Sequence, residues 1–81
     1  MIIVSQDKDT VVNFDNIEII GIGNPLEDDN GKFKILANTT SDSQYTLGQY
    51  DTEERAKEVL IEIVANYYNY ELMKKYEMPV A

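Results

Sequence analysis

Short runs of β-branched and other apolar residues, separated by polar turns, fill the first 50 residues of the chain. Runs of this length, bounded by clusters of Asp, Asn, Gly and Ser, are typical of strands joined by tight turns. The third run is mostly apolar, which favours a central place in a sheet, whereas the fourth alternates between apolar and polar side chains. The pattern predicts four or five strands over Ile2–Gln6, Val11–Phe14, Ile17–Ile22, Lys32–Asn38 and Gln44–Tyr50.

The last 30 residues have the periodicity of a helix. Asp51 can cap the helix, and Glu54 follows three residues later, as in a capping box. The pattern then continues to about Lys75, where a positive charge suits the C-terminal end of a helix. Met78-Pro79 follows and is expected to end it, because proline cannot continue a helix.

Together these elements predict an α+β fold in a single domain, residues 1–81. Residues 1–50 are expected to form an antiparallel meander of four to five strands, since short polar turns join neighbouring strands. Residues 51–76 are expected to form one long C-terminal helix packed on the sheet. The sequence contains no internal repeat and no linker that would indicate a second domain.

The predicted helix has more apolar surface than one sheet needs. With about 100° of rotation per residue, two neighbouring apolar arcs appear and the polar strip is narrow. The first arc suits the core and consists of Ala56, Val59, Leu60, Ile63, Tyr67 and Tyr70. The second arc consists of Ile61, Val64, Ala65, Tyr68 and Leu72.

The second arc is a candidate interface. An exposed apolar patch on a small domain indicates association with a protein, most simply with a second copy as a symmetric dimer. Tyrosine suits such surfaces because its ring is apolar and its hydroxyl reaches water or a partner. The alternative is that both arcs pack within one monomer. The predicted interface residues are Ile61, Val64, Tyr68, Leu72 and Tyr76.

Composition excludes several classes of function. The chain has no Cys and no His, so thiolate nucleophiles, imidazole-based triads and the usual zinc sites are ruled out. We therefore expect that the protein is not an enzyme and that it has no catalytic, cofactor-binding or metal-binding residues. The net charge of −8 argues against direct binding to nucleic acid and to anionic membranes. No signal peptide or membrane span is recognisable, so a cytoplasmic location is expected.

Two motifs resemble ligand sites but are incomplete. Gly21-Ile22-Gly23 begins like a dinucleotide fingerprint, but the third glycine is missing and no helix is predicted to follow. The acidic loop Glu27–Gly31 resembles half of a calcium loop. However, Ala37 stands where such a loop needs a bidentate glutamate. A hairpin turn is the expected role of this loop, and a weak Ca²⁺ site is the alternative.

Several segments carry a resemblance to a known group of proteins. They are Ile3-Val4-Ser5-Gln6-Asp7, Asn13-Phe14-Asp15-Asn16-Ile17, Tyr45-x-Leu47-Gly48-x-Tyr50-x-Thr52-Glu53-Glu54-Arg55-Ala56-Lys57-Glu58-Val59-Leu60 and Met78-Pro79. Over most of its length the chain resembles small uncharacterised proteins of Firmicutes bacteria and their phages. These segments are strand, turn and helix-cap motifs, so no functional residue carries over. The resemblance implies an accessory role, which in some phage proteins means blunting host defence.

Two functional hypotheses follow from the sequence. The first is a non-enzymatic acidic protein-interaction module that self-associates through its C-terminal helix. The second is a phage-type accessory protein that binds a small nucleotide-like ligand or inhibits a host protein that binds nucleic acid. A nucleotide would need cations beside aromatic rings, for which Arg55, Lys57 and the tyrosine cluster of Tyr67, Tyr68, Tyr70 and Tyr76 are the candidates. Because Arg55 is the only arginine in the chain, the first hypothesis is preferred.

Overall fold

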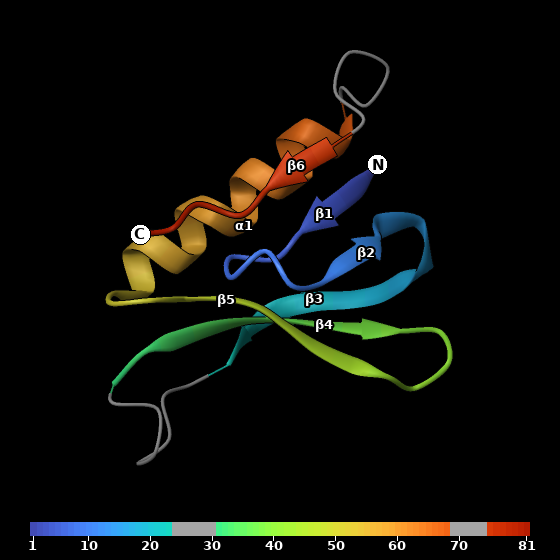
Figure 1. Ribbon diagram of the computed structural model, residues 1–81. Coiled ribbons are helices and arrows are strands. Elements are labelled where there is room, and N and C mark those ends of the chain that lie inside the picture. The colour runs from blue at the N-terminus through green and yellow to red at the C-terminus, as the bar shows by residue number, and fades with distance from the viewer. Residues whose placement is uncertain (24–30, 69–74) are drawn as a thin grey trace.

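The computed structural model describes residues 1–23, 31–68 and 75–81, which form six strands, one α-helix and one short 3-10 helix (Figure 1). The elements are β1 (Ile2–Val4), β2 (Val11–Asn13), η1 (Phe14–Asn16), β3 (Ile17–Gly23), β4 (Phe33–Thr39), β5 (Gln44–Tyr50), α1 (Glu53–Tyr68) and β6 (Lys75–Glu77). The predicted α+β class is confirmed. Most of the acidic loop Glu27–Gly31 lies outside the described residues, as do Tyr70 and Leu72.

The strands form two three-stranded sheets, so the prediction of one continuous meander is wrong. β3, β4 and β5 do form an antiparallel meander. In the other sheet β1 lies between β2, which is antiparallel to it, and β6, which is parallel. The break between the sheets is η1, where the Asn13 side chain accepts a hydrogen bond from the Asp15 N–H (3.0 Å). This local cap changes the direction of the chain, so β3 runs away from β2 and does not pair with it.

α1 differs from its predicted range of 51–76 at both ends. The Thr52 hydroxyl, rather than the predicted Asp51 carboxylate, caps the first turn by accepting a hydrogen bond from the Arg55 N–H (3.1 Å). Asp51 pairs instead with Lys32. At the other end Lys75 belongs to β6, and Met78 is buried in the core rather than ending a helix.

The core lies between α1 and the sheets. Ala56, Val59 and Ile63 are fully buried on one face of α1. In β5 a register shift opposite Ile35/Leu36 leaves Leu47 as an extra residue between Thr46 and Gly48, and both Leu47 and Gly48 are buried. A Cβ atom at Gly48 would lie 3.0 Å from the Tyr50 hydroxyl, which explains why glycine occupies this position.

Gln6 joins the two sheets to the C-terminal segment. Its backbone N–H donates to the Leu47 carbonyl (2.8 Å), and its side-chain Oε1 accepts from the Gln49 N–H (2.8 Å). Its Nε2 lies 3.0–3.1 Å from the carbonyl oxygens of Gln49, Pro79 and Val80. One side chain therefore provides both the donor and the acceptor that these exposed backbone groups need.

We predict that Gln6→Ala lowers the free energy of unfolding by about 1–2 kcal/mol, because several backbone groups lose their partners at once. Gln44→Ala is the matched control, since among the described residues the exposed Gln44 side chain bonds only to Asn38 Oδ1 (3.2 Å). It should change stability by less than about 0.5 kcal/mol. Urea unfolding followed by circular dichroism measures both variants. Equal losses in the two variants would contradict the role assigned to Gln6.

Candidate functional site

One surface of α1 is apolar and exposed, and we call it the apolar helix face; it is formed by Ile61, Val64 and Tyr68. The exposed fractions are 69% for Ile61, 54% for Val64 and 87% for Tyr68. The face holds a shallow groove of about 520 Å³, lined by Leu60, Ile61, Val64, Ala65 and Tyr68. These side chains come from a single helix, so the groove is a surface depression rather than an enclosed cavity.

The exposed residues follow the spacing of a helix–helix seam. Ile61, Val64 and Tyr68 stand three and four residues apart, and Lys57 lies four residues before Ile61. This spacing places all of them along one side of α1. The Lys57 ammonium lies 2.9 Å from Glu53 Oε1, and this hydrogen bond raises the pKa of Lys57. The seam is therefore charged at the N-terminal end of α1 and apolar towards its C-terminal end.

The structure brings together three of the five residues predicted for the interface. Ile61, Val64 and Tyr68 are exposed on one surface, so the alternative in which the second arc packs inside a monomer does not hold for them. Leu72 lies outside the described residues. The prediction for Tyr76 is wrong, because its side chain is only 5% exposed in β6.

Tyr76 is buried because β6 pairs with β1 rather than extending the helix. Its hydroxyl donates to Glu62 Oε1 (2.9 Å), which links β6 to α1. Burial raises the pKa of Tyr76, and the hydrogen bond to Glu62 raises it further. A three-residue strand with one buried side chain has too little periodicity to be recognised in a sequence.

Tyr67, expected in the core with its hydroxyl at the rim, lies at the edge of the core and is 38% exposed. Its ring packs against Phe14 with the centroids 4.6 Å apart. Its hydroxyl donates to Asp15 Oδ1 (3.2 Å), so the end of α1 is attached to the turn that separates the two sheets.

Arg55 is far from the two tyrosines at the end of α1 that the nucleotide hypothesis names beside it. Arg55 lies in the first turn of α1, where its Nε donates to the Ala81 carbonyl (3.1 Å) and its Nη1 lies 3.5 Å from Glu58. Tyr67 and Tyr68 lie in the last turn, roughly 18 Å along the helix at 1.5 Å per residue. The structure therefore does not bring Arg55, Tyr67 and Tyr68 into one site, although Arg55 shares a small pocket with Lys32 and Tyr50.

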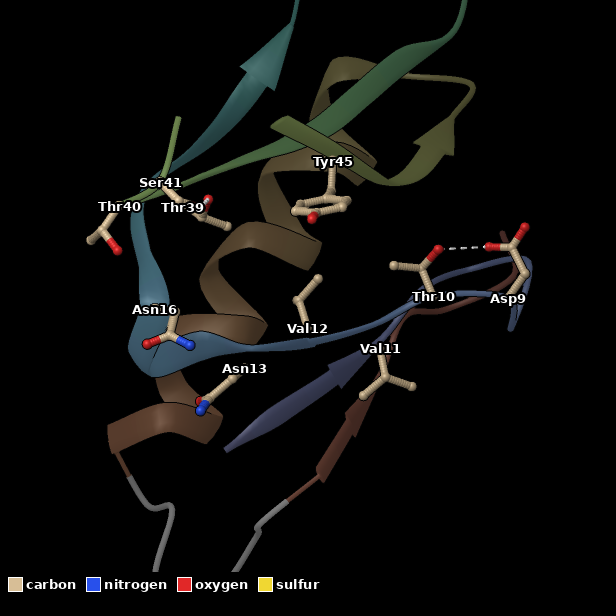
Figure 2. A pocket seen from close by; sticks show the side chains of 10 residues that line it. All are labelled: Asp9, Thr10, Val11, Val12, Asn13, Asn16, Thr39, Thr40, Ser41 and Tyr45. Atoms are coloured by element: carbon tan, nitrogen blue, oxygen red, sulfur yellow. Dashed lines mark hydrogen bonds between the residues drawn. The ribbon is translucent and has the colours of Figure 1, made fainter. Parts of the chain in front are cut away.

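A second concave surface, named here the strand-edge groove, lies between β2 and the β4–β5 hairpin (Figure 2). Its volume is about 650 Å³. β2 forms one wall, the Tyr45 ring forms the other, and the turn over residues 39–41 lies at one end. The sequence gives no sign of this groove, because its walls come from distant segments and carry no local motif.

The described part of the chain was also searched for metal-binding clusters and membrane-spanning helices. Within it, no group of three or more Asp, Glu, His or Cys side chains is placed to hold a metal ion. Within the same residues, no helix has both the length and the apolar character required to cross a membrane.

Comparison of the chain with protein-family models, with curated proteins and with solved structures found no match. The resemblance to small proteins of Firmicutes and their phages therefore stays a prediction.

Because Tyr50 and Tyr76 are buried, we predict that the protein loses stability at high pH. Burial raises the pKa of Tyr50 from 10.0 to about 12, and the pKa of Tyr76 is also raised. Because the folded protein holds these protons more tightly than the unfolded chain does, their contribution is complete below pH 10.0. It is lost progressively as the pH rises from 10.0 towards 12.

Urea unfolding between pH 9 and 12 measures this effect, and the double variant Tyr50→Phe/Tyr76→Phe is the comparison. We expect the variant to be less stable at pH 9, because Tyr50 loses its hydrogen bond to the Pro79 carbonyl (2.8 Å). Its stability should then fall less steeply above pH 10.0 than that of the parent protein. Parallel curves would show that other groups determine the alkaline transition.

Proposed function

We propose that the chain is a non-enzymatic protein-interaction module that forms a dimer through the apolar helix face. The observation that supports this most strongly is the exposure of Ile61, Val64 and Tyr68 on a helix whose other face already fills the core. Contiguous exposed apolar side chains on a small domain are characteristic of interaction surfaces. Burying them against another molecule removes this apolar surface from water.

A second copy is the partner that fits this face best. Lys57, Ile61, Val64 and Tyr68 have the alternating four- and three-residue spacing of positions d, a, d and a in a coiled coil. Two such seams are complementary to each other, as a two-fold interface requires. A helix pair also needs only a shallow surface, which is what the face offers.

The charges on the seam favour antiparallel helices. In an antiparallel pair centred between Ile61 and Val64, Ile61 of one copy faces Val64 of the other, and Lys57 faces Tyr68. The ammonium then lies against an aromatic ring, which is a favourable contact. A parallel pair would instead place Lys57 beside Lys57 and Glu54 beside Glu54, and like charges repel.

The net charge opposes this association. Two copies of charge −8 repel each other, and at 0.1 M salt this repulsion is screened only beyond about 10 Å. The face is also small compared with the roughly 800 Å² per partner of a standard interface. We therefore expect a dimer with a dissociation constant of about 10⁻⁵ M, and experiments are best run at about 0.5 M salt.

Val64→Glu should weaken the dimer at least about tenfold, because it places a carboxylate against Ile61 of the second copy. Val80→Glu is the matched control: Val80 is 76% exposed, and the substitution adds the same charge. Sedimentation equilibrium at several concentrations measures both variants against the parent chain. A parent chain that stays monomeric at 100 μM, or equal effects of the two substitutions, would overturn the proposed dimer.

The orientation can be tested by disulfide cross-linking, because the chain contains no native cysteine. A mixture of Lys57→Cys and Tyr68→Cys chains should form a cross-linked heterodimer under mild oxidation, whereas Tyr68→Cys alone should not cross-link. Disulfides require Cα atoms within about 7 Å, so only facing positions react. Efficient cross-linking of Tyr68→Cys with itself would indicate parallel helices instead. The measurement is non-reducing gel electrophoresis with mass spectrometry.

A further inference from the structure

We propose that the strand-edge groove binds an extended, basic peptide segment of a partner protein, which adds to the outer edge of β2 as a further strand. This proposal is independent of self-association through α1. It depends on three features: the free edge of β2, the shape of the groove and the charge around it.

The outer edge of β2 offers unpaired backbone groups. Among the described residues, β2 pairs only with β1. The bonds from Ser5 N–H to the Thr10 carbonyl (2.8 Å) and from Phe14 N–H to the Met1 carbonyl (3.0 Å) define which residues face β1. Because antiparallel pairing alternates along the strand, the backbone groups of Val11 and the N–H of Asn13 point away from β1.

The other sheet has an edge that is already covered. Along the second half of β5, the Leu47 carbonyl and the Gln49 N–H are bonded by Gln6. β2 has no equivalent cover in the described residues, and it carries neither a lysine nor a proline that would block pairing. Its 57% exposed Val11 side chain also leaves the edge open to solvent.

The groove has the shape that an added strand needs. The groove has a volume of about 650 Å³ and runs along β2, with the Tyr45 ring on the opposite side (Figure 2). Asp9 and Thr10 lie at one end, and the turn over residues 39–41 lies at the other. Five residues of extended peptide span roughly 16 Å and can therefore cover the three residues of β2 with one more at each end. Tyr45 can then contact an apolar side chain on the inner face of that peptide.

The negative charge in and around the groove favours binding of a basic peptide. Among the described residues that line the groove, Asp9 and Tyr45 are the only ionisable ones and none carries a positive charge. The nearest lysine in sequence, Lys8, is paired with Glu77 (3.1 Å). Asp15 and Asp42 flank lining residues in the chain, and the whole protein carries a net charge of −8. A peptide with lysines on its outer side therefore complements the groove, whereas an acidic peptide is repelled.

The test uses a capped seven-residue peptide that alternates lysine and valine, titrated into the ¹⁵N-labelled full chain. We expect the amide signals of Val11 and Asn13 to shift and their hydrogen exchange to slow, because both N–H groups become bonded. The same peptide with glutamate in place of lysine should bind at least about tenfold more weakly.

Two N-methylated peptides separate strand addition from simple charge attraction. One carries methyl groups on the lysine amides and the other on the valine amides, so that both keep the same charge. Only the amides on one side of a strand face β2, so one peptide should lose binding and the other should keep it. Equal binding of the two, or shifts confined to the acidic residues of α1, would overturn the proposal.

A pair of protein variants completes the test. Val11→Pro removes an outward N–H that makes no bond to β1, and it should reduce binding about tenfold. Val11→Thr keeps the N–H and the preference for strand and should bind as the parent does. Val64→Glu should leave peptide binding unchanged, so failure of this proposal is distinguishable from failure of the dimer.

Discussion

The hydrogen bonds of Gln6 hold together parts of the fold that share few other backbone bonds. β1 and β5 belong to different sheets, and the segment after β6 belongs to neither. The Gln6 side chain reaches the backbone of both β5 and that segment. Tyr50 and Arg55 add bonds to the carbonyls of Pro79 and Ala81. The C-terminal segment is thereby fixed beside the start of α1, and α1 is held with one face on the core.

This arrangement explains why the apolar helix face and the outer edge of β2 are both exposed. A chain this small cannot cover both faces of a helix and every strand edge. Ala56, Val59 and Ile63 use one face of α1 for the core, which leaves Ile61, Val64 and Tyr68 outside. The turn at η1 separates β2 from β3, which leaves the outer edge of β2 open in the same way. The exposed surfaces are thus consequences of how the core is assembled.

Several features were predictable because they depend on neighbours in sequence. The β3–β4–β5 meander and the two apolar arcs of α1 follow from periodicity, which directly reflects which side chains face the core. The helix cap was misplaced by one residue, from Thr52 to Asp51, because both side chains can accept the same hydrogen bond. Tyr76 was misplaced because a single buried residue in a short strand carries no periodic signal.

The α+β class, the acidic character and the surplus of apolar surface on the helix can all be predicted from the amino-acid sequence. These properties are sums or local patterns, so they do not depend on how distant segments meet. Three other features are visible only in the folded chain: β6 pairs with β1, Gln6 bridges the sheets, and a groove forms between β2 and Tyr45. Each of these joins residues far apart in the chain, and such contacts arise from the packing of the whole core rather than from any local propensity.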